Sequence, residues 1–434
     1  MLCVLAFQLY LYTSFLKVKI GRSEMNMKRL VIKHIGPVRF VDIKLKPYNF
    51  IIGPQSSGKS TIAKIYSTCQ WIEKEVATTQ NCDIIGDGNS FIQLVEGYHN
   101  MKGYFYNDSE ILYETESIVL LYEDEKLSIT LKPGYNYHRE KICYIPAERN
   151  AVTLPELQGL ALRNTSVRNF IFDWFNARDS YNENNKSDIL NLDVKYFYDN
   201  SKKEDKDRIV HYNGATYNIP LSNASSGLQS VVPLTIMLRY YTNEYFDTFQ
   251  SKTSFDESDK EREIRHRVVD NLVLKVLYPN YNPHDRQSII KKANERIHMQ
   301  DPEVMHCYEE YIKVTRQLLV PVRSSFVIEE PEQNIYPMTQ IDLIDSIVSL
   351  CVSERKHLFM ITTHSPFIIS YINILLQGKI NPDDLNVWTI VDGELENIIG
   401  YDKESKTYIV DGYELSAPMK TVFEMYRKRK NISE

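Results

Sequence analysis

The chain has 434 residues, with 51 Lys and Arg against 57 Asp and Glu, so its formal net charge is −6 at pH 7. Its 43% hydrophobic residues suffice for a large core, which excludes a long disordered chain, and the length predicts two or three domain-sized units. The slightly acidic balance confines any nucleic-acid contact to a local basic groove. The 6 cysteines are dispersed without a C-x-x-C pair, so we expect neither a zinc site nor a disulfide framework.

Residues 1–26 form an N-terminal extension whose segment 2–15 is apolar. This run is shorter than the roughly 20 residues that a membrane-spanning helix needs, and no basic segment precedes it as in a signal peptide. Three interpretations stay open: a start of translation at Met25 or Met27, a short membrane or interface anchor, and an exported protein. We expect no stable membrane insertion.

A glycine-rich loop follows the second expected strand. Residues 28–36 predict a first strand, residues 49–52 (NFII) a short buried one, and residues 62–76 a helix. Between the last two stand Gly53, Pro54, Gln55, Ser56, Ser57, Gly58, Lys59, Ser60 and Thr61, which match G-x-x-x-x-G-K-[ST] in its strand–loop–helix context. Such glycines let backbone N–H groups surround phosphates at the positive end of a helix.

The loop predicts a nucleotide site with ATP and Mg²⁺ as cofactors. Lys59 would reach the β- and γ-phosphates, and the Ser60 hydroxyl would ligate the metal. An ATP site argues against export, so we expect a cytoplasmic protein.

The middle of the chain combines strands, helices and polar loops. Residues 116–133 alternate like a hairpin around a charged turn. Residues 150–220 mix helix patterns with polar stretches at 179–188 and 201–208, which predict solvated loops. Ser225 is expected to cap a helix, and with Gly227 it offers N–H groups for a second anion site.

Two strand ends further along the chain supply chemical groups. Residues 325–328 (SFVI) predict a buried strand that ends in Glu329 and Glu330. Carboxylates at the carboxyl end of such a strand suit catalysis, with Glu329 in the Mg²⁺ shell and Glu330 as general base toward water. Residues 357–362 predict another buried strand, after which His364 would lie beside the γ-phosphate.

Taken in order, the loop at 53–61, the Ser-x-Gly helix start at 225–227, the E-E-P-E strand end and the T-H-S-P strand end resemble ABC-type ATPases of the SMC, Rad50 and RecF kind. The similarity extends to stand-alone AAA-family ATPases related to OLD proteins and to anti-phage ATPase subunits. The resemblance implies an α/β P-loop NTPase fold of ABC/SMC-head type with a helical lobe and a helical insert.

The resemblance also implies roles for single residues. Ser225 and Gly227 would be the signature motif, which contacts the γ-phosphate held by a second protomer. The segment 144–149 (YIPAER) takes the place of the Q-loop but has no glutamine, which leaves the roles of Glu148 and Arg149 open. Two further departures are Glu329, where Asp is usual, and Ala224, where Leu is usual.

The motif order divides the chain into five parts. An ATPase core lobe would cover 27–149, a helical lobe with the signature motif 150–248, a helical insert 249–320, and the remaining ATPase core 321–434. In the insert, residues 256–277 and 286–297 predict helices that either pack on the helical lobe or form a short antiparallel arm. The last part would contain a hairpin at 385–400 and a basic helix at 425–431.

We therefore expect an Mg²⁺-dependent ATPase, catalysed by Lys59, Glu330 and His364, that forms a homodimer through an ATP sandwich. The sequence has no nuclease motif, so a separate effector protein such as a nuclease would act with it, in an anti-phage system. The alternative is a RecF/SMC-like DNA-binding recombination or repair ATPase. Binding to DNA through the insert or the C-terminal helix stays open.

Overall fold

The structure is a computed structural model that describes residues 28–134, 136–154, 163–213, 216–251, 258–351, 355–411 and 420–428. The apolar N-terminal extension predicted over 1–26 lies outside these residues. Within the described ranges, none of the helices combines the length and the apolar composition needed to cross a bilayer.

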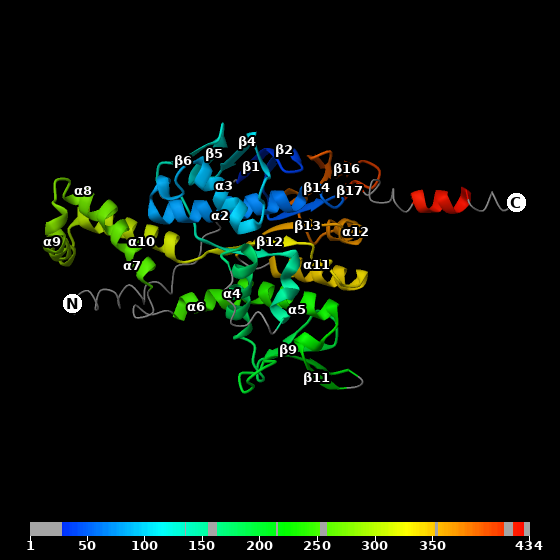
Figure 1. Cartoon of the computed structure of the whole chain (residues 1–434). Coiled ribbons are helices and arrows are strands. Elements are labelled where there is room, and N and C mark those ends of the chain that lie inside the picture. Colours follow the sequence, from blue (N-terminus) through cyan, green and yellow to red (C-terminus); the bar gives the residue numbers. More distant parts are fainter. Residues whose placement is uncertain are drawn as a thin grey trace.

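A large mixed sheet of 11 strands forms the centre of the molecule (Figure 1). Its strand order is β6-β5-β4-β1-β2-β15-β14-β3-β13-β12-β7. The strands are β1 (Arg29–Ile35), β2 (Val38–Lys44), β3 (Tyr48–Ile52), β4 (Phe105–Glu114), β5 (Ile118–Glu123), β6 (Lys126–Leu131), β7 (Glu140–Ile145), β12 (Arg323–Glu329), β13 (Leu358–Thr363), β14 (Leu385–Val391) and β15 (Glu394–Asn397). The predicted α/β fold class is confirmed.

Parallel pairing brings four strand ends to one edge of this sheet. Strand β13 lies between β3 and β12, and β12 also pairs with β7, all in parallel. Glu329 is the register partner of Thr362, and Thr363 is the partner of Ile52. The segments that follow β3, β12, β13 and β7 therefore start side by side, where open α/β sheets carry their sites.

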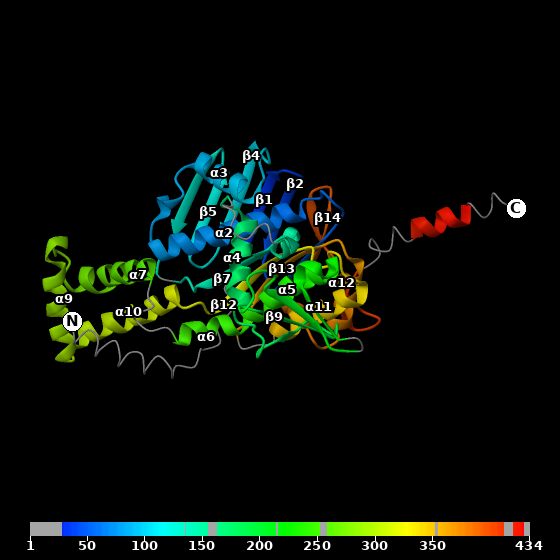
Figure 2. The same ribbon diagram turned by 60° about the horizontal axis from the view of Figure 1, so that its bottom comes forward.

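The core strands are buried on both faces, as the continuous apolar runs predict. Phe50 packs in one hydrophobic cluster and the next residue, Ile51, in another, because successive side chains point to opposite faces. Phe326 and Val327 divide between the same two clusters. One face is covered by α2 (Lys59–Thr79) and α3 (Gly88–His99), and the other by α4 (Ser166–Arg178), α5 (Ser226–Thr242), α11 (Pro337–Cys351) and α12 (Pro366–Leu375) (Figures 1 and 2).

The predicted helical lobe contains a second sheet that the sequence analysis did not anticipate. Its order is β11-β10-β9-β8, from β8 (Ser187–Asp188), β9 (Val194–Tyr198), β10 (Asp207–His211) and β11 (Tyr217–Pro220). The stretch 201–208, predicted to be a solvated loop, includes the first residues of β10. Its Asp207 is buried and accepts hydrogen bonds from Tyr196 (2.6 Å) and Arg178 (3.1 Å). Strand β11 leads directly into the segment before Ser225.

The insert forms an arm that projects from the body (Figures 1 and 2). Ile264 packs with Leu318 beside the body, whereas Leu274 packs with Cys307 further out, so the first and last helices of the arm run antiparallel. The elements are α6 (Glu244–Ser251), which precedes the arm, then α7 (Asp259–Val269), a π-helical turn (Asp270–Leu274), α8 (Lys275–Leu277), α9 (Arg286–His298) and α10 (Pro302–Leu319).

The arm is attached to the helix that follows the glycine-rich loop. Lys260 forms a 2.7 Å ion pair with Glu75 of α2, and Arg267 donates to the carbonyl of Thr78 (3.1 Å). Helix α10 continues almost directly into β12. Of the two expected arrangements of the insert, the structure therefore has the antiparallel arm, and it is anchored on the core lobe.

The end of the chain contains the predicted hairpin and, up to residue 428, the predicted basic helix, whose residues 429–431 lie outside the described ranges. Strands β14 and β15 pair antiparallel around Asp392 and Gly393, and β16 (Ile399–Asp402) and β17 (Thr407–Val410) form a second hairpin. Residues 420–428 are helical and exposed, and they lie apart from the body in both views (Figures 1 and 2).

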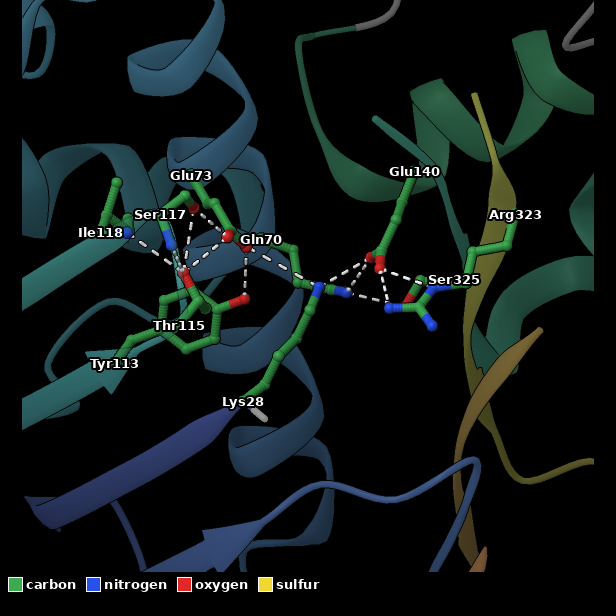
Figure 3. A network of polar contacts seen from close by, with 10 residues as sticks. All are labelled: Lys28, Gln70, Glu73, Tyr113, Thr115, Ser117, Ile118, Glu140, Arg323 and Ser325. Atoms are coloured by element: carbon green, nitrogen blue, oxygen red, sulfur yellow. Dashed lines mark hydrogen bonds and ion pairs between the residues drawn. The ribbon is translucent and has the colours of Figure 1, made fainter. Parts of the chain in front are cut away.

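A buried charge network lies at the opposite edge of the sheet, where the arm joins it (Figure 3). Glu140 of β7 accepts hydrogen bonds from Lys28 (2.7 Å) and from Arg323 at the start of β12 (2.9 Å). Glu73 of α2 lies 3.7 Å from Lys28 and accepts hydrogen bonds from Tyr113, Thr115 and Ser117. Burial opposes the charge on Glu140, but Lys28 and Arg323 lower its pKa to about 2.

We predict that Glu140→Gln destabilises the protein strongly at neutral pH, because two buried cations lose their carboxylate. Removing one partner of a buried ion pair costs about 3–5 kcal/mol of unfolding free energy. A carboxylate whose folded-state pKa is lowered stabilises the fold above its unfolded-state pKa, and loses this contribution as the pH falls from about 4.5 toward 2. Urea denaturation at several pH values measures both effects, and the variant should lose part of the wild-type pH dependence.

Glu114→Gln is the matched control, because Glu114 pairs with Lys132 at the exposed end of β4. That change should cost less than about 1 kcal/mol. Equal effects of the two substitutions would contradict the assigned role of the buried network.

Candidate functional site

The glycine-rich loop connects β3 to α2 in a conformation that its glycines make possible. Gly58, which precedes α2, has φ 109°, and Ser56 at the exposed tip has φ 59°. A Cβ atom on Gly53 would lie 2.4 Å from Ile390, and one on Gly58 would lie 2.7 Å from Val38. Larger residues at these two positions would push the loop out of its cradle between β2, β14 and the start of α2.

Lys59 folds back into this loop. Its Nζ donates to the carbonyls of Gly53 (2.9 Å) and Pro54 (2.7 Å) and lies 3.4 Å from Nδ1 of His364. Burial lowers the pKa of Lys59 to about 8, although Glu330, Glu332 and Glu329 favour its charged form. An anion bound in the loop would favour the charged form further.

Glu329 is the last residue of β12 and its side chain is buried. Tyr144, near the end of the neighbouring strand β7, donates a hydrogen bond to Oε1 of Glu329. Burial raises the pKa of Glu329, whereas Lys64 and a hydrogen bond from Ser60 favour its charged form. Ser60 and Glu329, the two residues predicted to hold the metal, are therefore in contact.

Glu330 occupies a conformation that few non-glycine residues adopt. Its φ is 45°, and its backbone N–H donates to the carbonyl of Thr362 on β13 (2.9 Å). The side chain points to His364, with 3.4 Å between Oε1 and Nε2. The turn after β12 thus directs Glu329 into the sheet edge and Glu330 toward the T-H-S-P turn.

His364 connects Lys59 with Glu330. Because a lysine ammonium can only donate, Nδ1 of His364 is the acceptor from Lys59, which places the proton of a neutral ring on Nε2, facing Glu330. The backbone N–H of His364 donates to Oε1 of Glu332 (2.5 Å). Ser365 caps α12 by accepting from the N–H of Ile368 (3.4 Å).

Ser225 and Gly227 begin α5 on the other side of the Glu329–Glu330 turn. Ser225 accepts from the N–H of Leu228 (3.4 Å), so the predicted N-cap is confirmed. A Cβ on Gly227 would lie 2.9 Å from the carbonyl oxygen of Asn334. Among the described residues, no hydrogen bond joins Ser225 or Gly227 to the loop at 53–61.

The structure brings Lys59, Ser60, Glu329, Glu330 and His364 together at one sheet edge. The surroundings fit a nucleotide phosphate chain and Mg²⁺. At Gly53 and Gly58 a Cβ would collide with neighbouring side chains, so the loop can pack there only with glycine. The buried hydroxyl of Ser57 has no hydrogen-bond partner, and the ammonium group of Lys59 faces the loop. Ser60 and Glu329 would hold Mg²⁺, since hydroxyl and carboxylate oxygens are ligands that it accepts.

Sequence reasoning assigned no role to three residues of this site, although it placed Arg149 and Tyr144 in a candidate segment and Glu332 in the E-E-P-E motif. Tyr144 contacts Glu329, Glu332 accepts the N–H of His364, and Arg149 donates to the backbone of the Glu329–Glu330 turn. These side chains come from the end of β7, from the segment after it and from the turn after β12, and only the parallel strand order brings them together.

Comparisons with known proteins return structural likenesses alone. No family model matches the sequence, and no curated protein matches it. Among solved structures, an SMC head domain from Thermotoga maritima shares 8% identity with a TM-score of 0.36, over 86% of this chain and 98% of that one. RecF of the RecFOR pathway, in complex with an ATP analogue, shares 9% identity with a TM-score of 0.29, over 86% and 98%.

An ATP-binding cassette of an ABC transporter, in its ADP conformation, shares 12% identity with a TM-score of 0.25, over 86% of this chain and 90% of that one. Likenesses at these scores assign neither an activity nor the role of any residue. The functional argument therefore depends on the geometry of this chain.

We predict that Gly58→Ala disrupts the loop, because the new Cβ meets Val38 at 2.7 Å and alanine is strained at φ 109°. The cost should be about 1–3 kcal/mol of unfolding free energy, together with a loss of nucleotide binding. Urea denaturation and titration with a fluorescent ATP analogue measure the two effects.

Gly97→Ala is the matched control, because Gly97 lies in the exposed interior of α3 with nothing within 4 Å of its added Cβ. The same substitution there should stabilise the helix by up to about 1 kcal/mol and leave binding unchanged. Normal binding by Gly58→Ala would contradict the assignment of the loop.

Proposed function

We propose that the protein is an Mg²⁺-dependent ATPase of ABC type that hydrolyses ATP at the edge formed by β3, β12 and β13. The convergence of the loop at 53–61 with Glu329, Glu330 and His364 carries this proposal. A phosphate-binding loop alone is compatible with nucleotide binding only. The adjacent carboxylate and histidine add the groups that hydrolysis needs.

Five residues of the chain have separate roles in the proposed hydrolysis. Lys59 exchanges its contacts with the carbonyls of Gly53 and Pro54 for contacts with the β- and γ-phosphates. Mg²⁺, held by Ser60 and Glu329, supplies charge neutralisation when it is bound. Glu330 accepts a proton from the attacking water while the γ-phosphorus separates from the bridging oxygen of ADP. His364, already 3.4 Å from Glu330, orients that water or the γ-phosphate.

The proposed active form is a head-to-head homodimer with ATP between the protomers. Gly227 packs against the carbonyl of Asn334 and Ser225 caps its own helix, so neither can serve the loop of its own chain without a rearrangement, which supports a role toward a second copy. Exposed apolar residues next to the site supply a surface for contact, namely Tyr336 (73% exposed), Met338 (59%) and Phe367 (49%).

In this scheme ATP stabilises the closed dimer, and hydrolysis removes the contacts to the γ-phosphate. The nucleotide state would thereby control a separate effector protein such as a nuclease, in a cytoplasmic anti-phage system. The support for this role is the motif order of the sequence.

A RecF/SMC-like DNA-binding ATPase is the second candidate. It is favoured by exposed basic residues on two elements that project from the body, Lys291 and Lys292 of α9 and Arg427 and Lys428 of the C-terminal helix. ATP turnover that rises with duplex DNA, and loses this stimulation steeply with salt, would support this candidate over effector control.

We predict different defects for two substitutions in the site. Lys59→Ala should weaken ATP binding at least about tenfold, since the loop loses its cation. Glu330→Gln should bind ATP normally but hydrolyse it about 10²–10⁴-fold more slowly, since an amide cannot accept the proton. Phosphate release and equilibrium titration measure the two quantities.

The matched controls are Lys126→Ala and Glu123→Gln, on exposed positions of β6 and β5 at the far side of the sheet. Both should behave like the wild type. Equal turnover by Glu330→Gln and the wild type would contradict the mechanism.

We predict that Glu330→Gln forms a dimer in the presence of Mg²⁺ and ATP but not with ADP, because slow hydrolysis preserves the γ-phosphate contacts. Adding Ser225→Arg should abolish this dimer and leave ATP binding to the monomer intact. Sedimentation velocity measures the oligomeric state. A dimer that forms equally well with ADP, or that tolerates Ser225→Arg, would contradict the ATP sandwich.

A further inference from the structure

Arg149 is the most completely enclosed cation of the site, and none of the expected roles explains it. It follows β7 in the short helical segment Ala147–Thr153, and its exposure is 0%. Burial of a guanidinium costs free energy unless every N–H group finds an acceptor. Burial lowers the pKa of Arg149 to about 10, although Glu332 and Glu330 nearby favour its charge.

The guanidinium has five N–H donors, and five backbone carbonyls receive them. Nε donates to Ser230 (3.2 Å), Nη1 to Pro146 (3.4 Å) and Glu329 (3.0 Å), and Nη2 to Glu330 (2.8 Å) and Pro331 (3.3 Å). Within the described ranges, no hydrogen bond or ion pair joins Arg149 to a carboxylate. It therefore acts as a connector of backbone segments and not as the partner of an acid.

Three of these carbonyls belong to the turn that carries Glu329 and Glu330. Glu330 has φ 45°, which is unfavourable for a residue with a Cβ and persists only when its surroundings enforce it. Arg149 holds the carbonyl of Glu330, and Thr362 accepts the N–H of the same residue (2.9 Å). These two hydrogen bonds, from Arg149 and to Thr362, hold the backbone of Glu330 so that its side chain points toward His364.

A fourth carbonyl belongs to α5, the helix that Ser225 caps. Ser230 lies in the second turn of that helix, and its carbonyl accepts from Nε of Arg149. The close approach of Gly227 to Asn334 forms a second connection between the same helix and the same turn. A shift of α5 would therefore move the Glu330 turn through Arg149.

We infer that Arg149 is a positioning residue that fixes Glu330 for proton transfer and connects it to the helix that begins at Ser225. This inference rests on the proposed ATP hydrolysis. Arg149 links the last residue of β12, Glu329, to Ser230 of α5. A lysine cannot replace it, since an ammonium group has three N–H donors and Arg149 donates to five carbonyls.

The test compares Arg149→Lys with the wild type in ATP affinity and in kcat. ATP affinity should change less than about threefold, because Arg149 does not line the loop, whereas kcat should fall at least tenfold. In the Glu330→Gln background the same substitution should have almost no further effect, since Arg149 acts through that side chain. Equal losses in both backgrounds would overturn the inference, as would unchanged kcat in an active enzyme.

Arg178→Lys is the matched control. The side chain of Arg178 is 11% exposed, and it pairs with Asp207 (3.1 Å) in the helical lobe, away from the Glu330 turn. It should lower the melting temperature without changing kcat. If Arg149→Lys and Arg178→Lys lower kcat equally, the effect of Arg149 is a general loss of stability and the inference fails.

Hydrogen exchange provides a readout that does not need turnover. The N–H groups of Glu330 and Gln333, bonded to Thr362 and to Glu330, should exchange slowly in the wild type without nucleotide. Exchange near the rate of an unfolded chain would show that the turn is not fixed, and would overturn the inference even if the lysine variant does not fold. Absence of ATP turnover by the wild type, in contrast, would contradict the proposed function itself.

Discussion

The register of the parallel strands β3, β13, β12 and β7 is the constraint on which the site depends. Glu329 is paired with Thr362 and Thr363 with Ile52, so the loop, the carboxylates and the histidine leave the sheet at one level. A slip of one residue in β12 would turn Glu329 to the opposite face and exchange the two hydrophobic clusters that Phe326 and Val327 separate. The hydrophobic core and the site are thus specified by the same pairing.

The two edges of the parallel sheet differ in structure: one carries the candidate site and the other a buried ion-pair network. At the carboxyl edge, charged groups line a site whose backbone bends through positive φ at Ser56, Glu330 and Asn334. At the opposite edge, Lys28, Glu140 and Arg323 form a buried, fully paired network where the arm joins the body. Helix α2 runs from the site to this junction and β12 runs from the junction to the site, so the arm is attached to the two elements that carry Lys59 and Glu329.

Local patterns predicted the strands, the loop and the strand-end residues well. The NFII and SFVI runs, the G-x-x-x-x-G-K-S match and the capping Ser225 each depend on short-range sequence, and the structure places them as expected. The strands at 187–220 were missed because they are short and interrupted by charges, such as Asp207, that are buried only through partners distant in sequence.

The tertiary parts of the site could not be predicted for the same reason. Arg149 lies 180 residues from Glu329 in the chain, and its five acceptors are backbone carbonyls that carry no sequence signal. The contact of Tyr144 with Glu329 likewise requires that β7 and β12 be neighbours.

The structure of Glu330→Gln with ATP and Mg²⁺ would test the central claim most directly, because it locates the phosphates. The account predicts that Lys59 leaves the carbonyls of Gly53 and Pro54 for the β- and γ-phosphates, that Ser60 and Glu329 face the metal, and that Ser225 of a second copy reaches the γ-phosphate. Nucleotide bound elsewhere, or phosphates that touch neither Lys59 nor the N–H groups of the loop, would contradict it.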